Sequence, residues 1–286
     1  MKVTRAATPF LPLCQLLLPS RLAGLSVTLL KATALEIAIL AGHLLLYPSG
    51  IVQERRSAPA LPSPETAQLP TGAKPPVVLL HGFIDNRSVF VLLRRNLAQH
   101  GRQHVESLNY SPLTCDIRTA AELLGRHIEE ICERTGHPQV DIVGHSLGGL
   151  IARYYAQCLG GDAHVRTLVT LGTPHSGTRV APLMNAHPIV RQMRPGSEVI
   201  EELAMPAPGC RTQFVSFWSD LDHLMDPLES ACVDHPDLLA HNVRVSGVGH
   251  LALPVHPAVA TGIRQALDME EADIRTATRT GGLTVA

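Results

Sequence analysis

The sequence predicts an α/β fold in which a mostly parallel central sheet carries helices on both faces. Two kinds of pattern lead to this prediction. One is a series of short continuous apolar runs, and the other is a series of stretches in which apolar residues recur every three or four positions. The two kinds alternate from residue 76 onward. Continuous apolar runs are typical of strands buried on both faces, and their alternation with helices is typical of a parallel sheet. The length of 286 residues suffices for one such domain with additional segments.

The apolar runs give the expected strands in chain order. They cover residues 77–80, 105–110, 140–143, 165–171, 213–218 and 242–248. Each run is four to seven residues long, which is an ordinary strand length.

Helical patterns occupy the intervals between these runs. The first follows the opening strand and ends at Gly101. The second and the last each place apolar residues one turn apart on one face, namely Ala120, Leu124, Ile128 and Ile131, and Val259, Ile263 and Leu267. Such faces are expected to cover the sheet. Residues 177–209 are too long for a plain connection, so they are expected to form a lid-like or covering insertion.

Composition divides the chain further. Residues 1–56 are expected to form an apolar leader or membrane segment, and residues 57–75, rich in Pro, Ser and Ala, a linker. The folded domain is then expected over residues 76–270, with a tail over residues 271–286. The formal net charge of −1 gives no electrostatic case for a polyanion, so nucleic acid is not an expected partner.

The apolar run from Leu22 to Tyr47 is long enough for a helix that crosses a bilayer, but it includes Lys31, Glu36 and His43. Three interpretations stay open. The favoured one is an uncleaved apolar helix that precedes the fold and associates the protein with a membrane. The second is an export signal, cut near residues 57–60, which would give a secreted protein. The third is a buried core helix.

None of the six cysteines has the close paired spacing of a zinc site. In an exported protein, Cys210 and Cys232 would be the expected disulfide pair, because both lie in expected loops that flank one strand. The alternative is a set of buried free thiols that pack as small apolar groups.

The stretch VDIVGHSLGGLIARYYAQ, residues 140–157, places Ser146 between glycines where a strand gives way to a helix. A serine at the apex of so tight a turn holds a strained backbone, and the flanking glycines let strand and helix approach each other. The Leu147 amide would then point at a developing oxyanion from the helix N-terminus. This placement predicts that Ser146 is a nucleophile.

A second oxyanion donor is expected directly after the opening strand. The stretch LLHGF, residues 79–83, has a His-Gly pair at the end of a buried strand. Such a turn can aim the Phe83 amide across the edge of the sheet.

An acid is expected in FWSDLDHLMDP, residues 217–227, which leaves a strand. Asp222 is preferred because it lies a few residues past the strand and precedes apolar residues, and Asp220 and Asp226 are the alternatives. Its carboxylate could orient a histidine and stabilise the imidazolium.

His250 is the expected general base. It follows the last strand and a glycine-containing loop that can reach back over the serine turn. His256 and His223 are the alternatives. The resulting chain order of nucleophile, acid and base is the order that the α/β-hydrolase arrangement uses.

On these stretches the chain resembles members of the α/β-hydrolase superfamily, and within it bacterial triacylglycerol lipases and esterases. The motifs that carry the resemblance are VVLLHGF, VDIVGHSLGGLIARYYA, LVTLGTPHSGT, SDLDHLMDP and GVGHLALP. The resemblance implies the α/β-hydrolase fold, a triad of Ser146, Asp222 and His250, and an oxyanion hole made by the amides of Phe83 and Leu147. It also implies hydrolysis of carboxylic esters through an acyl-enzyme.

The expected function is therefore a serine hydrolase of lipid metabolism, a lipase or esterase acting on lipid or acylglycerol esters. Apolar residues of the insertion would line an acyl pocket or simply pack on the sheet. No cofactor is expected, since the spacing of Asp226, Asp234 and Asp237 matches no calcium loop. The alternatives are an acyltransferase with the same triad, a non-catalytic membrane-tethered binding protein with this fold, and a peptidase.

Overall fold

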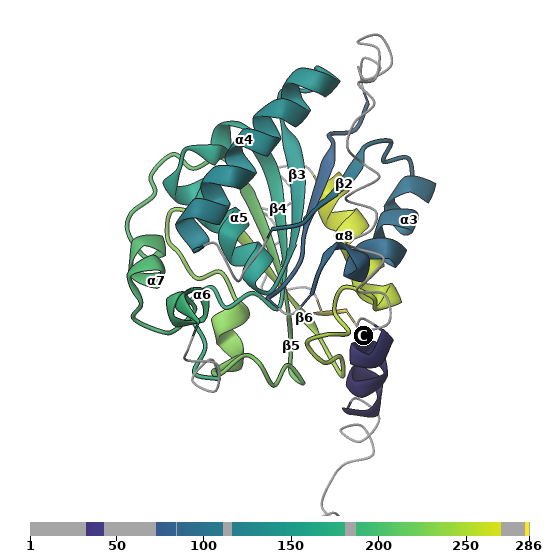
Figure 1. The fold of residues 1–286 in the computed structure, drawn as a ribbon, viewed down its shortest axis with the longest axis vertical. Coiled ribbons are helices and arrows are strands. Elements are labelled where there is room, and N and C mark those ends of the chain that lie inside the picture. The colour runs from purple at the N-terminus through teal and green to yellow at the C-terminus, as the bar shows by residue number, and fades with distance from the viewer. Residues whose placement is uncertain are drawn as a thin grey trace, which may run out of the picture.

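The computed structural model describes residues 33–42, 73–83, 85–110, 116–180, 187–269 and 284–285. In this part of the chain, seven parallel strands form one sheet in the order β2-β1-β3-β4-β5-β6-β7 (Figure 1). The strands are β1 Val77–Leu80, β2 Val105–Leu108, β3 Val140–His145, β4 Val165–Leu171, β5 Gln213–Ser219, β6 Leu239–Val245 and β7 Thr284–Val285.

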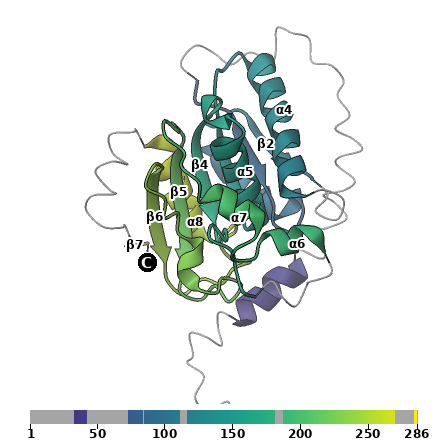
Figure 2. The same ribbon diagram turned by 90° about the vertical axis from the view of Figure 1, so that its left-hand side faces the viewer.

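Helices cover both faces of this sheet. They are α3 Val91–Gln99, α4 Ile117–Thr135, α5 Leu147–Cys158, α6 Pro188–Gln192, α7 Glu198–Leu203 and α8 Pro257–Asp268, with short 3-10 turns at Arg87–Phe90, Gly161–Ala163 and Leu228–Ala231. Figure 2 shows α4, α5 and α7 in front of the sheet, and Figure 1 shows α3 and α8 together on the opposite side. This arrangement confirms the predicted α/β-hydrolase fold class.

Each face of the sheet has its own apolar core. Alternate residues of β1 point to opposite faces, so Val78 and Leu80 join the core under α4 and α5, while Val77 and Leu79 join the core under α3 and α8. A strand between two cores is apolar at nearly every position. The continuous apolar run that predicted β1 is thus a consequence of the two-sided packing.

Helix α4 shows how local signals set an element's ends. The Asp116 side chain accepts a hydrogen bond from the Thr119 amide at 2.7 Å, which caps the first turn. Gly136 follows the last residue with φ of 69°, the left-handed conformation that ends many helices. The glycine that marks the end of this helix in the sequence is therefore its C-cap.

The bounds of five strands differ from the prediction. β2 ends two residues earlier, at Leu108, β3 runs two residues further, to His145, and β5 one residue further, to Ser219. β6 covers residues 239–245 instead of 242–248. β7 lies inside the stretch expected to be a tail, where Thr284 and Val285 pair with Arg244 and Val245 of β6. The reason is the same in β6 and β7: hydrogen bonding to a neighbouring strand decides the boundary, and the apolar pattern does not report it.

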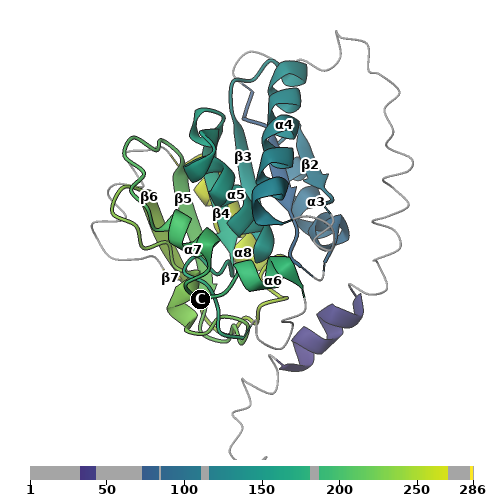
Figure 3. The same ribbon diagram turned by 60° about the vertical axis from the view of Figure 1, so that its left-hand side comes forward.

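Residues 33–42, within the predicted apolar segment, form a helix at the lower end of the molecule (Figure 3). Its Ile39 packs against the core under α3 and α8. No helix in the described ranges is long and apolar enough to cross a membrane. The rest of the apolar run, residues 57–72 of the expected linker and most of the expected tail lie outside the described residues. Membrane association and export therefore stay predictions.

Candidate active site

Ser146 is the single residue between the end of β3 and the start of α5. Its backbone has φ of 52° and ψ of −120°, and in the described ranges no other residue except glycine has positive φ. The turn is fixed by two hydrogen bonds. The Ser146 amide donates to the Leu171 carbonyl at 2.9 Å, and the Thr173 hydroxyl donates to the Ser146 carbonyl at 2.9 Å. The strained turn is the one that a nucleophilic serine uses.

Two glycines make this turn sterically feasible. A Cβ atom on Gly144 would lie 2.5 Å from the Cα of Gly149, and a Cβ on Gly148 would overlap the carbonyl oxygens of Leu80 and His81. The start of α5 therefore packs directly against the end of β1.

The turn after β1 lies beside the serine as a result. A Cβ on Gly82 would be 3.3 Å from the Cβ of Ser146. Phe83 lines the same cavity as Ser146, and Leu147 is the first residue of α5. The two residues expected to donate their amides thus flank Ser146 from two different elements, and their role as oxyanion donors stays a prediction.

Asp222 and His250 are in direct contact. The Nδ1 of His250 donates to Oδ2 of Asp222 at 2.8 Å, and both side chains are buried. The other carboxylate oxygen of Asp222 accepts the Leu224 amide at 3.0 Å. Since Nδ1 is the donor in this contact, Nε2 of a neutral imidazole is left as the acceptor. That atom is the one a general base needs.

The alternative acids have other partners. Asp220 accepts hydrogen bonds from the Gly247 amide and the Arg244 guanidinium, both at 2.9 Å, so it holds the loop that leads to His250. Asp226 forms an exposed ion pair with Arg179 at 3.5 Å. Of the alternative histidines, His256 precedes α8 as its N-cap residue and His223 is exposed.

A second buried pair, His145 and Asp85, lies beside His250 and was not predicted from the sequence. The Nε2 of His145 donates to the His250 carbonyl at 3.2 Å, and its Nδ1 lies 3.3 Å from Oδ2 of Asp85. The rings of the two histidines are 4.8 Å apart. Asp85 stands in a polar stretch with no periodic pattern, and the signal that could have found it is the histidine at the end of an otherwise apolar strand.

The electrostatic surroundings act differently on the two histidines. Burial lowers the pKa of His145, and its contact with Asp85 only partly offsets this. Burial also disfavours the charged form of His250, but the carboxylates of Asp222, Glu36 and Asp85 outweigh burial and raise the pKa of His250. His250 is therefore the imidazole that these surroundings prepare to take up a proton.

A cavity of about 220 Å³ adjoins these residues. Its polar lining includes Ser146, His250 and Asp85, and its apolar lining comprises Phe83, Pro174, Val180, Val190, Met193, Leu224, Met225 and Leu251. Some residues of the insertion line this cavity and others pack on the sheet, so both of the alternatives expected for it occur. Val180, Val190 and Met193 line the cavity, whereas Ile189, Val199 and Leu203 are buried in the core under α4 and α5.

Cys210 and Cys232, the pair expected to bond if the protein is exported, are free thiols in this structure, which agrees with the alternative of unpaired cysteines. Burial raises the pKa of the Cys232 thiol to about 11. Among the described residues, no group of three or more His, Cys, Asp or Glu side chains could hold a metal ion. Asp237 instead accepts the Ala207 amide at 2.8 Å.

A family model described as the alpha/beta hydrolase fold matches residues 75–197, which include Phe83 and Ser146. Two curated relatives are similar to parts of the chain. A triacylglycerol lipase of Burkholderia plantarii is 28% identical over 129 residues, which is 43% of this chain and 36% of the relative. A triacylglycerol lipase of Pseudarthrobacter phenanthrenivorans is 29% identical over 113 residues, 37% of this chain and 35% of the relative. The matched part is thus about a third of the relatives' length.

Solved structures show the same fold. The mature form of a Bacillus licheniformis lipase aligns with a TM-score of 0.60 at 17% identity, over 71% of this chain and 96% of that chain. Lipase B of Aspergillus fumigatus aligns with a TM-score of 0.61 at 17% identity, over 77% of this chain and 62% of that one. At this level of identity the likeness concerns the fold.

Proposed function

We propose that the chain, whose residues 75–197 match the alpha/beta hydrolase family model, hydrolyses carboxylic esters with Ser146 as nucleophile, His250 as general base and Asp222 as its acid partner. The observation that carries the proposal is the buried contact between Asp222 and His250 beside a cavity that Ser146 also lines. A fold alone does not give an activity, but an activated serine needs these three groups together.

The proposed hydrolysis has two steps, acylation of Ser146 and hydrolysis of the acyl-enzyme. The Nε2 of His250 takes the proton of the Ser146 hydroxyl while the oxygen attacks the ester carbonyl, and the imidazolium then gives that proton to the leaving alcohol. Water next attacks the acyl-enzyme with His250 again as base, which releases the carboxylic acid and restores Ser146. Asp222 keeps Nδ1 protonated and stabilises the imidazolium in both steps.

The negative charge on the carbonyl oxygen requires donors that are already in place. We assign them to the amides of Leu147, at the N-terminus of α5, and Phe83, in the turn beside Ser146. Both amides belong to backbone that lies close to Ser146, where close packing of the glycines brings the turn after β1 and the start of α5 together. Donors already in place need little rearrangement as the charge develops.

The acyl group is proposed to be apolar, as in lipid or acylglycerol esters. Support comes from the cavity, whose lining includes eight apolar residues from the turn after β1, the insertion and the loops after β4, β5 and β6. A wall of this kind favours hydrocarbon over charged acyl groups. A panel of p-nitrophenyl esters from acetate to palmitate should show higher kcat/KM for chains longer than acetate. A strong preference for acetate would contradict the lipid assignment and leave a short-chain esterase.

The activity is tested with a fluorophosphonate probe and p-nitrophenyl butyrate on the full chain. The wild-type protein should be labelled on Ser146, and Ser146→Ala should lose both labelling and ester turnover with an unchanged circular dichroism spectrum. Ser176→Ala is the matched control, because Ser176 lies in the turn after β4 and does not line the cavity. Turnover retained in Ser146→Ala would overturn the proposal.

A further inference from the structure

Glu36, on the helix formed by residues 33–42, reaches the loop that carries His250. Its Oε2 accepts the Leu251 amide at 3.0 Å and its Oε1 accepts the Ala252 amide at 2.9 Å. These are the two amides that directly follow His250. A carboxylate held by two N–H groups is a strong, charge-assisted contact.

The two amides are free for this contact because of the turn that they begin. The chain turns back on itself here, with the Leu253 amide donating to the His250 carbonyl and the His256 amide donating to the Ala252 carbonyl. The first amides of such a turn have no acceptor inside it, as in the first turn of a helix. Glu36 supplies the acceptors from a distant segment, as a capping side chain does.

Gly249 makes room for the carboxylate. A Cβ atom there would lie 2.5 Å from Oε1 of Glu36 and 2.6 Å from its Cγ. Gly249 is not one of the glycines with positive φ, so its backbone conformation is open to other residues. The glycine that precedes His250 thus lets Glu36 come this close, and a methyl group there would displace the Glu36 carboxylate.

The rest of the helix agrees with this docking. Residues 33–42 contain no other acidic or basic residue. Ile39 packs against the core under α3 and α8, while Leu35, Ile37 and Leu40 are exposed. A carboxylate on an apolar helix is costly to bury unless its oxygens accept hydrogen bonds, and both oxygens of Glu36 do.

We propose that Glu36 is a positioning residue for His250, holding the backbone that follows the base in the place from which its ring reaches Ser146. The proposal deepens the ester-hydrolase function and rests on it. Glu36 acts through the amides of Leu251 and Ala252 and does not touch the reacting atoms. The helix of residues 33–42 thereby belongs to the working enzyme although it lies outside the α/β sheet and its covering helices.

Glu36 also contributes charge at this site. The titratable groups that face His250 are Asp222 from the loop after β5, Asp85 from the loop after β1, His145 from β3, and Glu36. Glu36 and Asp85 can both be replaced without changing a residue assigned to the triad, and Glu36 is the one that accepts the amides after His250. Its neutralisation should lower the pKa of His250, because one of the charges that favour the imidazolium is removed.

The test compares Glu36→Gln with Ile37→Gln in the full chain. Glutamine keeps one acceptor oxygen, but its NH₂ group faces an N–H donor, so one of the two amides loses its partner. Expected for Glu36→Gln is a fall in kcat/KM of roughly 10- to 100-fold and a shift of the acidic midpoint to lower pH. Ile37→Gln changes the exposed side of the same helix and should match the wild type in both readouts.

An amide-exchange measurement makes the test independent of activity. The Leu251 and Ala252 amides should exchange with solvent about tenfold faster in Glu36→Gln, as expected for the loss of one hydrogen bond in a local opening. Faster exchange together with unchanged kinetics would overturn the positioning role. Unchanged exchange would show that Glu36 does not hold the loop and would overturn the proposal at its first step. A wild-type protein without esterase activity would instead contradict the proposed function.

A double-mutant cycle with Gly249→Ala tests whether this glycine acts by making room for Glu36. If the added methyl group acts by displacing Glu36, then Gly249→Ala should lower kcat/KM in the wild-type background and have little further effect in Glu36→Ala. Equal effects of Gly249→Ala in both backgrounds would show that the glycine serves the loop itself. That outcome would contradict the inference drawn from Gly249.

Discussion

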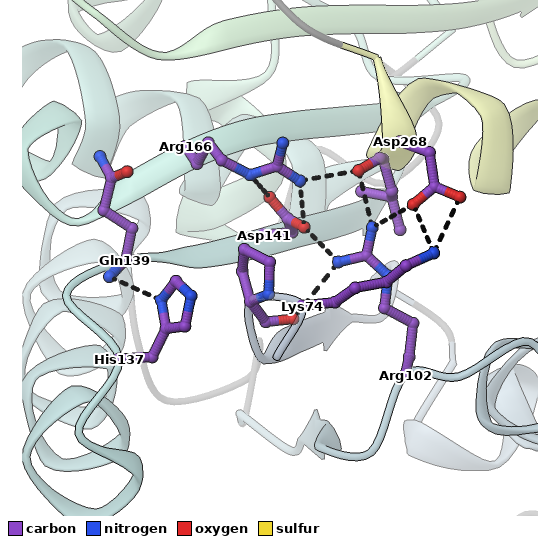
Figure 4. Close-up of polar contacts among 9 residues, drawn as sticks. Lys74, Arg102, His137, Gln139, Asp141, Arg166 and Asp268 are labelled. Atoms are coloured by element: carbon purple, nitrogen blue, oxygen red, sulfur yellow. Dashed lines mark hydrogen bonds and ion pairs between the residues drawn. The ribbon is translucent and has the colours of Figure 1, made fainter. Parts of the chain in front are cut away.

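Asp141 and Asp222 are fully buried aspartates of the same molecule with opposite surroundings. Asp141 is the second residue of β3, at the end of the parallel sheet where its strands begin, and Asp222 follows β5 at the end where the strands finish. Arg102 and Arg166 contact Asp141 at 2.7 to 2.9 Å (Figure 4). Asp222 instead contacts one imidazole and one backbone amide.

The contacts around Asp141 continue into other elements. Arg102 and Arg166 also donate to the Leu267 carbonyl near the C-terminus of α8, at 2.6 and 2.7 Å, and Arg102 and Lys74 both contact Asp268. The group ties β3, β4 and the segment before β2 to α8. The side chains that contact Asp141 are guanidinium groups, whereas the partner of Asp222 is an imidazole, which can take up and release a proton. The contacts of Asp141 join elements of the fold, while those of Asp222 place it beside a cavity, where we propose a catalytic role.

The comparison predicts that replacing Asp by Asn affects activity at Asp222 and stability at Asp141. In Asp222→Asn the amide donates to Nδ1 of His250, so the imidazole takes the wrong tautomer and kcat should fall about 10⁴-fold. The unfolding midpoint should change little. Turnover of p-nitrophenyl butyrate and thermal unfolding measure the two quantities, with Asp220→Asn as the matched control. Similar losses in both variants would contradict the assignment of Asp222.

Asp141→Asn should show the reverse pattern. It removes the charge that faces two guanidinium groups, so that the buried Arg102 keeps only the half-exposed Asp268 as its counter-charge. This change should lower the free energy of unfolding by about 3–5 kcal/mol. Urea unfolding measures this loss. The kcat of the protein that remains folded should stay within about twofold of wild type, because no atom of the group borders the cavity. A large loss of kcat without a loss of stability would break the comparison.

The pH profile gives the next largest effect. Protonated His250 cannot take the proton of Ser146, so kcat/KM should fall as pH decreases through the pKa of His250. Because the surrounding carboxylates outweigh burial and raise that pKa, the midpoint should lie above the ordinary value of 6.5. A stopped assay over a range of pH values measures it. A midpoint below 6.5 would show that burial prevails over the carboxylates.

Asp85→Asn tests whether the neighbouring carboxylates cause the raised pKa of His250. It removes one of the charges that raise the pKa of His250 and weakens the contact with His145, so the midpoint should move to lower pH. We expect kcat/KM at the plateau to fall by about tenfold or less, because Asp85 acts through His145 and not on the ester. Asn86→Asp, next in sequence, controls for changes in the loop. An unchanged midpoint would exclude Asp85 from the electrostatics of the site.

The smallest effect is expected for Lys74→Ala. Its ion pair with Asp268 joins two side chains that are 44% and 49% exposed, so its loss should cost about 0–1 kcal/mol of unfolding free energy. The same urea titration compares it with Asp141→Asn. A loss as large as that of Asp141→Asn would mean that the group acts as one unit in which the exposed pair matters as much as the buried one.

The sequence predicted those parts of the fold that local pattern determines. β1 and β4 have the expected bounds because their residues, apart from the partly buried Arg166, are all buried. β6 begins three residues earlier than expected because residues 239–241 pair with β5 although Ala240 and His241 read as loop. Only the neighbouring strand supplies that information.

The site was predictable to the same extent. Ser146, Asp222 and His250 each follow a strand of a parallel sheet, so their order along the chain was enough to place them at one edge. Asp85 and Glu36 lie outside any such rule. In the sequence, Glu36 is only a charge in an apolar run, and its partners are 215 and 216 residues away.

That separation has a consequence for how the protein is made. The segment with Glu36 leaves the ribosome before the loop with Leu251 and Ala252 has been synthesised. At ~5–20 residues per second, the intervening chain takes about 10–40 s to produce. During this time Glu36 has neither of its hydrogen-bond donors, and α8, which contributes to the core on which Ile39 packs, has not been made. The arrangement around His250 is therefore completed only after translation has passed residue 252.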